Sequence, residues 1–174
     1  QRILDVYRRQ GRFAATVEPK LIELGENRVN LVFEIQEGTA TKVQSINFIG
    51  NRAFSDSQLR DIITTSQSSW LDFLKGTSIY DPDRMRLDKE LLRQYYLKNG
   101  YADVEITAAS AELDRDGTGF YLTFTVNEGP LYTFGEVKIE SSLPELQPES
   151  LQSSMLTKPG ARFNASYIEK TVEK

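Results

Sequence analysis

The residues that most often carry out catalysis or bind transition metals are missing from this chain. Its 174 residues include no histidine and no cysteine, which excludes disulfides, Cys/His zinc sites and histidine-based triads. Carboxylates remain, and a pair of them can hydrolyse a glycosidic bond as acid and base. Asp81 and Asp83 lie close in sequence, but Pro82 between them is typical of the first position of a helix. We therefore interpret both acids as capping and dipole partners of that helix.

Two further polar motifs also have structural interpretations. Asp114-Arg-Asp-Gly117 resembles the start of a calcium loop, but the later ligands and the bidentate glutamate are missing, so a plain turn explains it better. Asn164-Ala-Ser166 fits a glycosylation sequon and also a helix N-cap, which we prefer. No Gly-Lys-Ser/Thr phosphate loop is present in the sequence. We therefore predict a protein with no enzymatic activity, no metal and no other cofactor.

The composition is that of an ordinary folded protein. Hydrophobic residues make up 39% and charged residues 26% of the chain, and no apolar run is long enough to cross a bilayer. The net charge of -4 and the pI of about 5.0 argue against a nucleic-acid partner, because phosphates require a basic surface. The length allows one medium domain or two small ones.

One pattern of helix end, strands and turn occurs twice in the sequence. Tyr7-Arg-Arg-Gln-Gly11, an alternating strand and Glu37-Gly38 form the first copy. Tyr96-Leu-Lys-Asn-Gly100, a second such strand and Glu128-Gly129 form the other. Apolar residues then follow each Glu-Gly pair at matching positions: Val43, Ile46 and Phe48 in one copy, and Phe134, Val137 and Ile139 in the other. Repeats of this size predict a row of like modules, which bind more often than they catalyse.

The central copy predicts the order β-α-α-β-β and an α+β fold. A strand at 43–49 precedes a helix whose N-cap is Ser55, with Gln58 as its capping-box partner. A second helix begins after Asp81 and ends near Gly100. Two strands follow, joined by a hairpin turn at 114–119, and residues 120–127 alternate as expected of a sheet with one face covered.

Apolar positions change parity inside the first strand of this hairpin, which predicts a β-bulge near Ala108 and Ala109. The first copy shows a similar change of parity around Pro19, so we expect a bulge there as well. The two ends of the chain look like half-modules. Residues 130–174 should supply a strand at 136–140, a helix near 148–156 and a helix that runs from Asn164 to Lys174.

Four stretches in this order and spacing resemble the POTRA (polypeptide-transport-associated) family. They are Ile46-Asn-Phe-Ile-Gly-Asn51, Tyr95-Tyr-Leu-Lys-Asn-Gly-Tyr-Ala102, Val126-Asn-Glu-Gly129 and the loop that contains Trp70. The resemblance covers essentially the whole chain, although Gly11-Arg12-Phe13 departs from the Gly100-Tyr101 pattern. It implies a three-stranded mixed sheet with two helices on one face, repeated in tandem. It divides the chain into the second half of one POTRA domain (1–38), a complete domain (39–129) and the first half of another (130–174), which would be the second, third and fourth domains of an assembly factor.

The resemblance also implies a function on the periplasmic side of a Gram-negative outer membrane. The expected partners are unfolded outer-membrane proteins, accessory lipoproteins of the assembly complex and the C-terminal β-barrel of the full-length protein. If the first strand of the module pairs with the far side of 120–126, the other hairpin strand keeps a free edge and can bind a guest strand by β-augmentation. The alternative is a structural spacer in a related transporter, TamA-like or of two-partner secretion, which binds no client directly.

Three groups of residues carry this hypothesis. The binding edge consists of Asp103, Val104, Glu105, Ile106, Thr107, Ala108, Ala109, Ser110 and Ala111. A possible hydrophobic contact loop consists of Trp70, Leu71, Phe73 and Leu74. Because exposed apolar patches are uncommon, we favour the interpretation that this loop folds back over the helix pair. The predicted interdomain hinges are Gly38 with Thr39 and Gly129 with Pro130. Half-modules of neighbouring molecules would also be able to complement each other, as in domain swapping.

Overall fold

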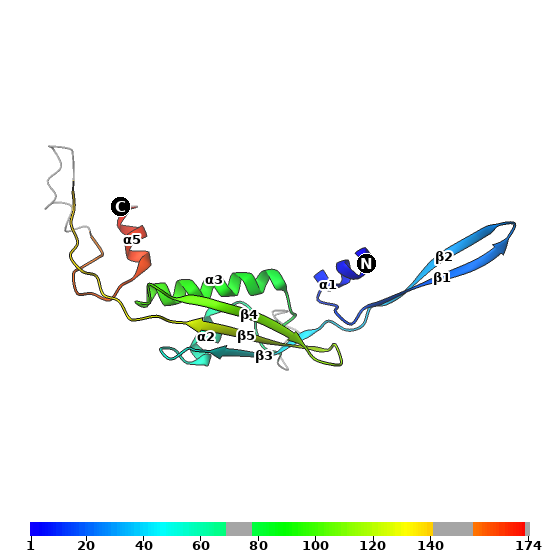
Figure 1. The fold of residues 1–174 in the computed structure, drawn as a ribbon, viewed down its shortest axis with the longest axis horizontal. Coiled ribbons are helices and arrows are strands. Elements are labelled where there is room, and N and C mark those ends of the chain that lie inside the picture. The colour runs from blue at the N-terminus through cyan, green and yellow to red at the C-terminus, as the bar shows by residue number, and fades with distance from the viewer. Residues whose placement is uncertain (69–77, 141–154, 173–174) are drawn as a thin grey trace.

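The computed structural model describes residues 1–68, 78–140 and 155–172. Figure 1 shows a two-stranded hairpin near the N-terminus, a central sheet covered by helices, and an extended segment that leads to a C-terminal helix. The elements are α1 (Arg2–Arg9), β1 (Thr16–Gly25), β2 (Arg28–Gln36), β3 (Lys42–Ile49), α2 (Asp56–Ile62), α3 (Pro82–Lys98), β4 (Glu105–Leu113), β5 (Gly119–Asn127) and α5 (Ala165–Val172). Within the described residues, no helix is long and apolar enough to cross a membrane.

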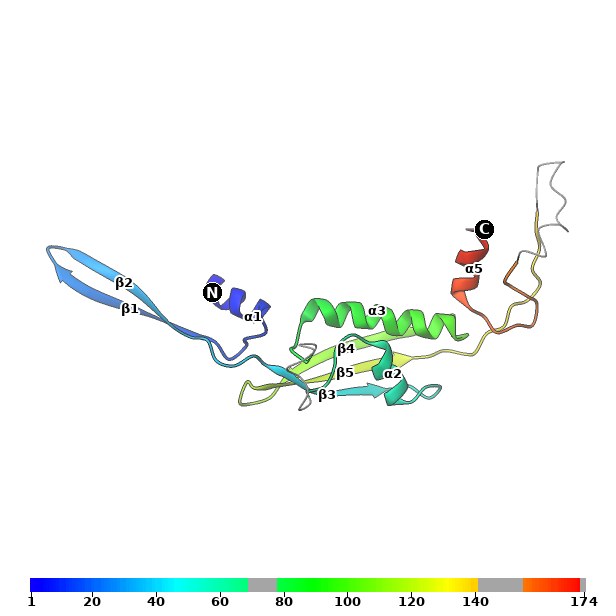
Figure 2. The same cartoon turned by 180° about the vertical axis from the view of Figure 1, so that it is seen from behind.

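The central sheet confirms the predicted α+β fold. Its strand order is β3-β5-β4, with β5 in the middle, parallel to β3 and antiparallel to β4. The helices α2 and α3 lie on one face of this sheet (Figures 1 and 2). We call residues 39–129, which contain this sheet and both helices, the central module.

The core of the central module lies between the sheet and α3. Phe120, Leu122, Phe124 and Val126 of β5 are buried, whereas the alternate residues Tyr121 and Asn127 are exposed. This is the period-two pattern of a strand with one covered face. The helices and the flanking strands complete the core with Leu59, Met85, Leu92, Tyr96, Val43, Ile46, Val104 and Ile106.

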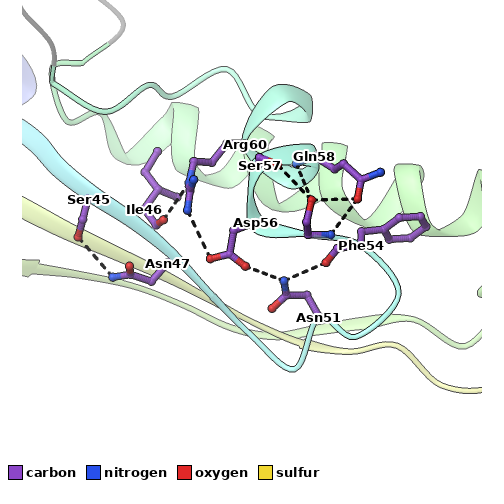
Figure 3. A network of polar contacts seen from close by, with 10 residues as sticks. Ser45, Ile46, Asn47, Asn51, Phe54, Asp56, Ser57, Gln58 and Arg60 are labelled. Carbon is purple, nitrogen blue, oxygen red and sulfur yellow. Dashed lines mark hydrogen bonds and ion pairs between the residues drawn. The ribbon is translucent and has the colours of Figure 1, made fainter.

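Local capping interactions fix the helix ends as predicted. The Ser55 hydroxyl accepts a hydrogen bond from the Gln58 N–H at 3.4 Å, and the Gln58 side chain accepts one from the Ser55 N–H at 2.9 Å (Figure 3). Asp81 caps α3 by accepting hydrogen bonds from two backbone N–H groups. Gly100 ends α3 with a φ of +99°, and the Tyr101 N–H bonds the Tyr96 carbonyl at 3.1 Å. These contacts satisfy backbone groups that the helix itself leaves unpaired.

The predicted bulge exists, one residue earlier than expected. Ile106 pairs with Val126 and Ala108 pairs with Thr125, so Thr107 is the inserted residue. The bulge expected near Pro19 is wrong, because the β1–β2 register runs without a break from Thr16 to Glu23 and shifts only before Gly25. The parity change there arises because Ile22 lies opposite Asn30 on the more polar face of the hairpin.

The hairpin β1–β2 has one mostly apolar face. The register places Leu21 opposite Leu31 and Pro19 opposite Phe33, so these side chains share a face. Leu21, Leu31 and Phe33 are 70%, 54% and 49% exposed. The matching face of β5 in the central module is covered by helices, as its buried residues show.

The C-terminal part agrees only in part with the sequence. The helix start at Asn164 is confirmed, because its side chain accepts a hydrogen bond from the Ser166 N–H at 3.0 Å and α5 follows. Residues 136–140 are not a strand, since no described segment pairs with them and a lone strand is not stable. Nearly all of the helix expected at 148–156, and the last two residues of the helix expected to end at Lys174, lie outside the described residues.

Candidate strand-binding edge

The central sheet has two outer strands, and the edge of β3 is occupied by its own chain. The Val43 N–H donates to the Ser78 carbonyl at 2.7 Å, and the Val43 carbonyl accepts from the Ser68 N–H at 2.7 Å. Further along β3, Arg60 Nε donates to the Ile46 carbonyl at 3.3 Å (Figure 3). A guest strand would have to displace these contacts.

The outer edge of β4 carries no such cover from the described residues, in which β4 pairs with β5 alone. The alternation of an antiparallel ladder shows which groups are free. Because the Asp114 N–H bonds the Gly119 carbonyl at 2.8 Å, the main-chain groups of Glu112 and Ser110 also face β5. The main-chain groups of Leu113, Ala111 and Ala109 therefore face outward.

Side chains along this edge leave the backbone accessible. Residues 108–111 have small side chains, and all are exposed except Ala111, which is half-buried. The bulged Thr107 is also exposed, and its hydroxyl donates to the Thr125 carbonyl at 3.3 Å. Two exposed acids, Glu105 and Glu112, flank the open stretch. A guest held here would be recognised mainly through its backbone.

The first residues of the predicted edge have other roles. Val104 and Ile106 are 6% and 5% exposed and belong to the core. Asp103 accepts a hydrogen bond of 2.5 Å from the Tyr132 hydroxyl, which raises the pKa of Tyr132. Asp103 and Val104 precede β4, which begins at Glu105, whereas the other residues of the predicted edge lie in the strand. The hydrophobic loop of Trp70, Leu71, Phe73 and Leu74 lies outside the described residues.

Sequence reasoning missed two carboxylates that organise the central module. Glu128 Oε1 accepts from the Arg52 and Ala53 N–H groups at 2.9 Å each and from the Tyr96 hydroxyl at 3.0 Å. Burial, followed by the Glu128 carboxylate, raises the pKa of Tyr96 far above its ordinary value. Asp88 is fully buried and accepts hydrogen bonds from Thr64 and Thr65. The tyrosine and Glu-Gly positions that recur in the repeat were a signal for the Tyr96–Glu128 contact. No local pattern indicated that Asp88 would accept hydrogen bonds from Thr64 and Thr65.

The hydrogen bonds of these carboxylates are structural. Across residues 1–68, 78–140 and 155–172, no cluster of three acidic groups can hold a metal ion. The central module is a small α+β unit in which, among the described residues, one outer sheet edge is occupied and the other is open.

The POTRA family model, described as a surface antigen variable number repeat, matches residues 41–129, just over half of the chain. The chain belongs to this family. It is 28% identical over 156 residues to the outer membrane protein assembly factor BamA of Neisseria meningitidis serogroup B, covering 90% of this chain and 20% of that protein. It is 27% identical over 173 residues to BamA of Buchnera aphidicola, covering 99% of this chain and 28% of that protein.

A solved structure shares the fold of the chain. The Haemophilus influenzae BamA POTRA3-5 structure superposes with a TM-score of 0.57 at 16% identity, covering 97% of this chain and 63% of that one. The mixed sheet with two covering helices is therefore the POTRA fold. The chain spans only 20% and 28% of the length of these two curated relatives.

Proposed function

We propose that this chain is part of the periplasmic POTRA region of an outer-membrane protein assembly factor. Its relatives are outer membrane protein assembly factors by name, and the chain resembles them over most of its length. In this proposal residues 1–38, 39–129 and 130–174 belong to three successive POTRA domains. The region has no enzymatic activity and works by binding unfolded outer-membrane proteins, accessory lipoproteins, or both.

The observation that carries the binding proposal is the difference between the two sheet edges. The β3 edge is occupied by Ser68, Ser78 and Arg60, whereas the β4 edge is paired only on its β5 side in the described residues. A client strand adds to β4 through the outward groups of Ala109, Ala111 and Leu113. Backbone pairing of this kind accepts many sequences, which suits a factor with many clients.

The energetics favour a weak and reversible complex. Four to six new backbone hydrogen bonds contribute roughly 0.5–1.5 kcal/mol each. Ordering each client residue costs about 1–2 kcal/mol. The two nearly cancel, so a bound strand is released quickly and can be passed onward.

Amide chemical shifts test this proposal. An extended peptide that alternates apolar and polar residues, like an outer-membrane β-strand, is titrated into the isotope-labelled chain. We expect the amides of Ala109, Ala111 and Leu113 to shift more than those of β3.

Ala109→Pro removes one outward N–H at an edge, where proline is tolerated, and should weaken peptide binding about tenfold. Ala109→Ser keeps the N–H and serves as the matched control. Shifts confined to other surfaces, or equal binding by both variants, would contradict the proposal.

A structural spacer that binds no client is the second candidate. It is favoured by the repeated hydrogen bonds of Gly11 with Thr41 and of Gly100 with Tyr132, because contacts between successive units suit a rod that sets distances. The same titration distinguishes the two, since a spacer gives no saturable shift along β4.

A further inference from the structure

The two places where one unit meets the next are built from the same backbone contact. Gly11 follows α1, and its carbonyl accepts a hydrogen bond from the Thr41 N–H at 2.7 Å. Gly100 follows α3, and its carbonyl accepts one from the Tyr132 N–H at 2.8 Å. Both glycines have positive φ, +77° and +99°. In each case the end of a helix is bonded to the first extended residues of the next unit.

A second pair of contacts clamps those extended residues from the other side. The Thr41 carbonyl accepts a hydrogen bond from the Tyr80 N–H at 3.2 Å, and the Tyr132 carbonyl accepts one from the Phe163 N–H at 3.0 Å. Tyr80 and Phe163 stand directly before the caps of α3 and α5. Thr41 and Tyr132, which donate to the glycine carbonyls, are therefore each held between the helix end of one unit and the pre-helix segment of the next.

Both glycines lie close against side chains of the next unit. A Cβ added to Gly11 would lie 2.3 Å from Ile79 Cγ2, and one added to Gly100 would lie 2.6 Å from Leu131 Cδ1. A contact below 3.0 Å would force the Ile79 or Leu131 side chain to shift, so the residue after each helix lies directly against the next unit. At the first junction the Phe13 ring also packs on Phe120, with ring centroids 4.8 Å apart, and so joins the core of the central module.

A hydrogen bond also fastens each connector to the helix that precedes it. Tyr7 bonds Glu37, and Tyr96 bonds Glu128, both at 3.0 Å. Each glutamate stands immediately before a predicted hinge glycine, Gly38 or Gly129, whose φ values are +64° and +67°. Both positions have the same left-handed conformation, which glycine adopts without steric cost and which suits a tight turn.

We propose that each junction is a rigid clasp, in which Gly11 and Gly100 are positioning residues that hold the next unit in one orientation. Gly38 and Gly129 supply the turn and do not act as flexible hinges. The clasp keeps β1 and β4, the corresponding strands of successive units, at a fixed separation and angle. It is independent of whether β4 binds a client.

Distance measurements between two spin labels test the clasp. Because the chain has no cysteine, Glu18→Cys on β1 and Lys89→Cys on α3 place one label on each side of the first junction. Lys89→Cys with Glu112→Cys gives a reference pair inside the central module. We expect the distance distribution across the junction to be about as narrow as the reference, because a clasped pair of units moves as one body. A distribution much broader than the reference would overturn the proposal.

Two glycine variants then separate the clasp from general backbone strain. Gly11→Ala should broaden the junction distribution to about twice its width while leaving the reference pair unchanged. Gly160→Ala is the matched control, because Gly160 has the same φ of +77° and no atom within 4 Å of an added Cβ. Equal widths for the two variants would show that the close contact at Gly11 does not position the next unit. If Gly11→Ala does not fold, the width of the junction distance distribution in the otherwise unsubstituted chain still tests the proposal.

Discussion

Tyr96 donates a hydrogen bond of 3.0 Å to Glu128, and Tyr7 repeats this contact with Glu37 at the same length. The two copies differ in their surroundings. Tyr96 is fully buried, and Glu128 accepts two further backbone N–H groups. Tyr7 is half-buried, and Glu37 also pairs with Arg12 at 3.6 Å. The same pair therefore closes both copies of the repeat, but only the central one does so inside a core.

Stability at high pH should depend on Tyr96. Burial and the neighbouring Glu128 carboxylate raise its pKa in the folded protein, whereas a tyrosine in the unfolded chain titrates near 10.0. Below that pH both states keep the proton, and the hydrogen bond contributes fully. Above it the unfolded chain loses a proton that the folded chain retains, so the free energy of unfolding falls by up to about 1.4 kcal/mol per pH unit.

Tyr96→Phe isolates this effect. At neutral pH the variant should be about 1–3 kcal/mol less stable, because a buried hydrogen bond to a charged group is lost. The deficit should shrink as the pH rises above 10.0, since phenylalanine does not titrate. Urea unfolding at several pH values measures both quantities. Tyr121→Phe, on the exposed face of β5, is the control and should follow the unsubstituted protein. If Tyr96→Phe were less stable by the same amount at every pH, the raised pKa of Tyr96 in the folded protein would be contradicted.

Sequence reasoning succeeded where the determining contacts are local. The Ser55–Gln58 box, the Asp81 cap and the Asn164 cap each depend on residues two or three positions apart, so their spacing is visible in the sequence. The alternation of β5 likewise follows from one covered face. The strand order that leaves β4 open came from the family resemblance, because nothing in the strands themselves specifies which one is central.

The failures all involve partners distant in sequence. Asp88 looked like one more charged residue of α3, and only the fold brings Thr64 and Thr65 to its carboxylate. The alternation at 136–140 suggested a strand, but a strand also needs a neighbour. The parity change around Pro19 suggested a bulge, but the unbroken register places Ile22 opposite Asn30 of the distant strand β2, on the more polar face of the hairpin.

Removing the Asp88 carboxylate should destabilise the central module strongly. Asp88 Oδ1 accepts from the Thr64 N–H at 2.6 Å and the Thr64 hydroxyl at 2.7 Å, and Oδ2 accepts from the Thr65 N–H at 3.2 Å. Asp88→Ala removes the acceptor of the buried Thr65 N–H and of both Thr64 donors, so we expect a loss of about 2–4 kcal/mol in the free energy of unfolding. Denaturant titration measures it.

Two further variants make this measurement specific. Asp88→Asn keeps an amide oxygen that can accept from Thr64 and should cost less than alanine. Asp116→Ala removes an exposed carboxylate in the β4–β5 turn and should change stability by no more than about 0.5 kcal/mol. If Asp88→Ala were as mild as Asp116→Ala, the carboxylate would not be holding the segment after α2 against α3.

The bulge at Thr107 gives the last prediction, which concerns control of the open edge. Ile106 pairs with Val126 and Ala108 with Thr125, so the residues on either side of Thr107 already have the parity of a continuous ladder. Deleting Thr107 therefore joins them without turning any side chain to the other face. The core should be retained, and β4 should become a longer, regular edge.

Because bulges protect edges from unwanted pairing, we expect the deletion variant to self-associate, seen as a concentration-dependent rise in sedimentation coefficient. Thr107→Ala keeps the bulge and should sediment as the unsubstituted chain does, and equal behaviour of the two variants would show that the bulge does not guard this edge.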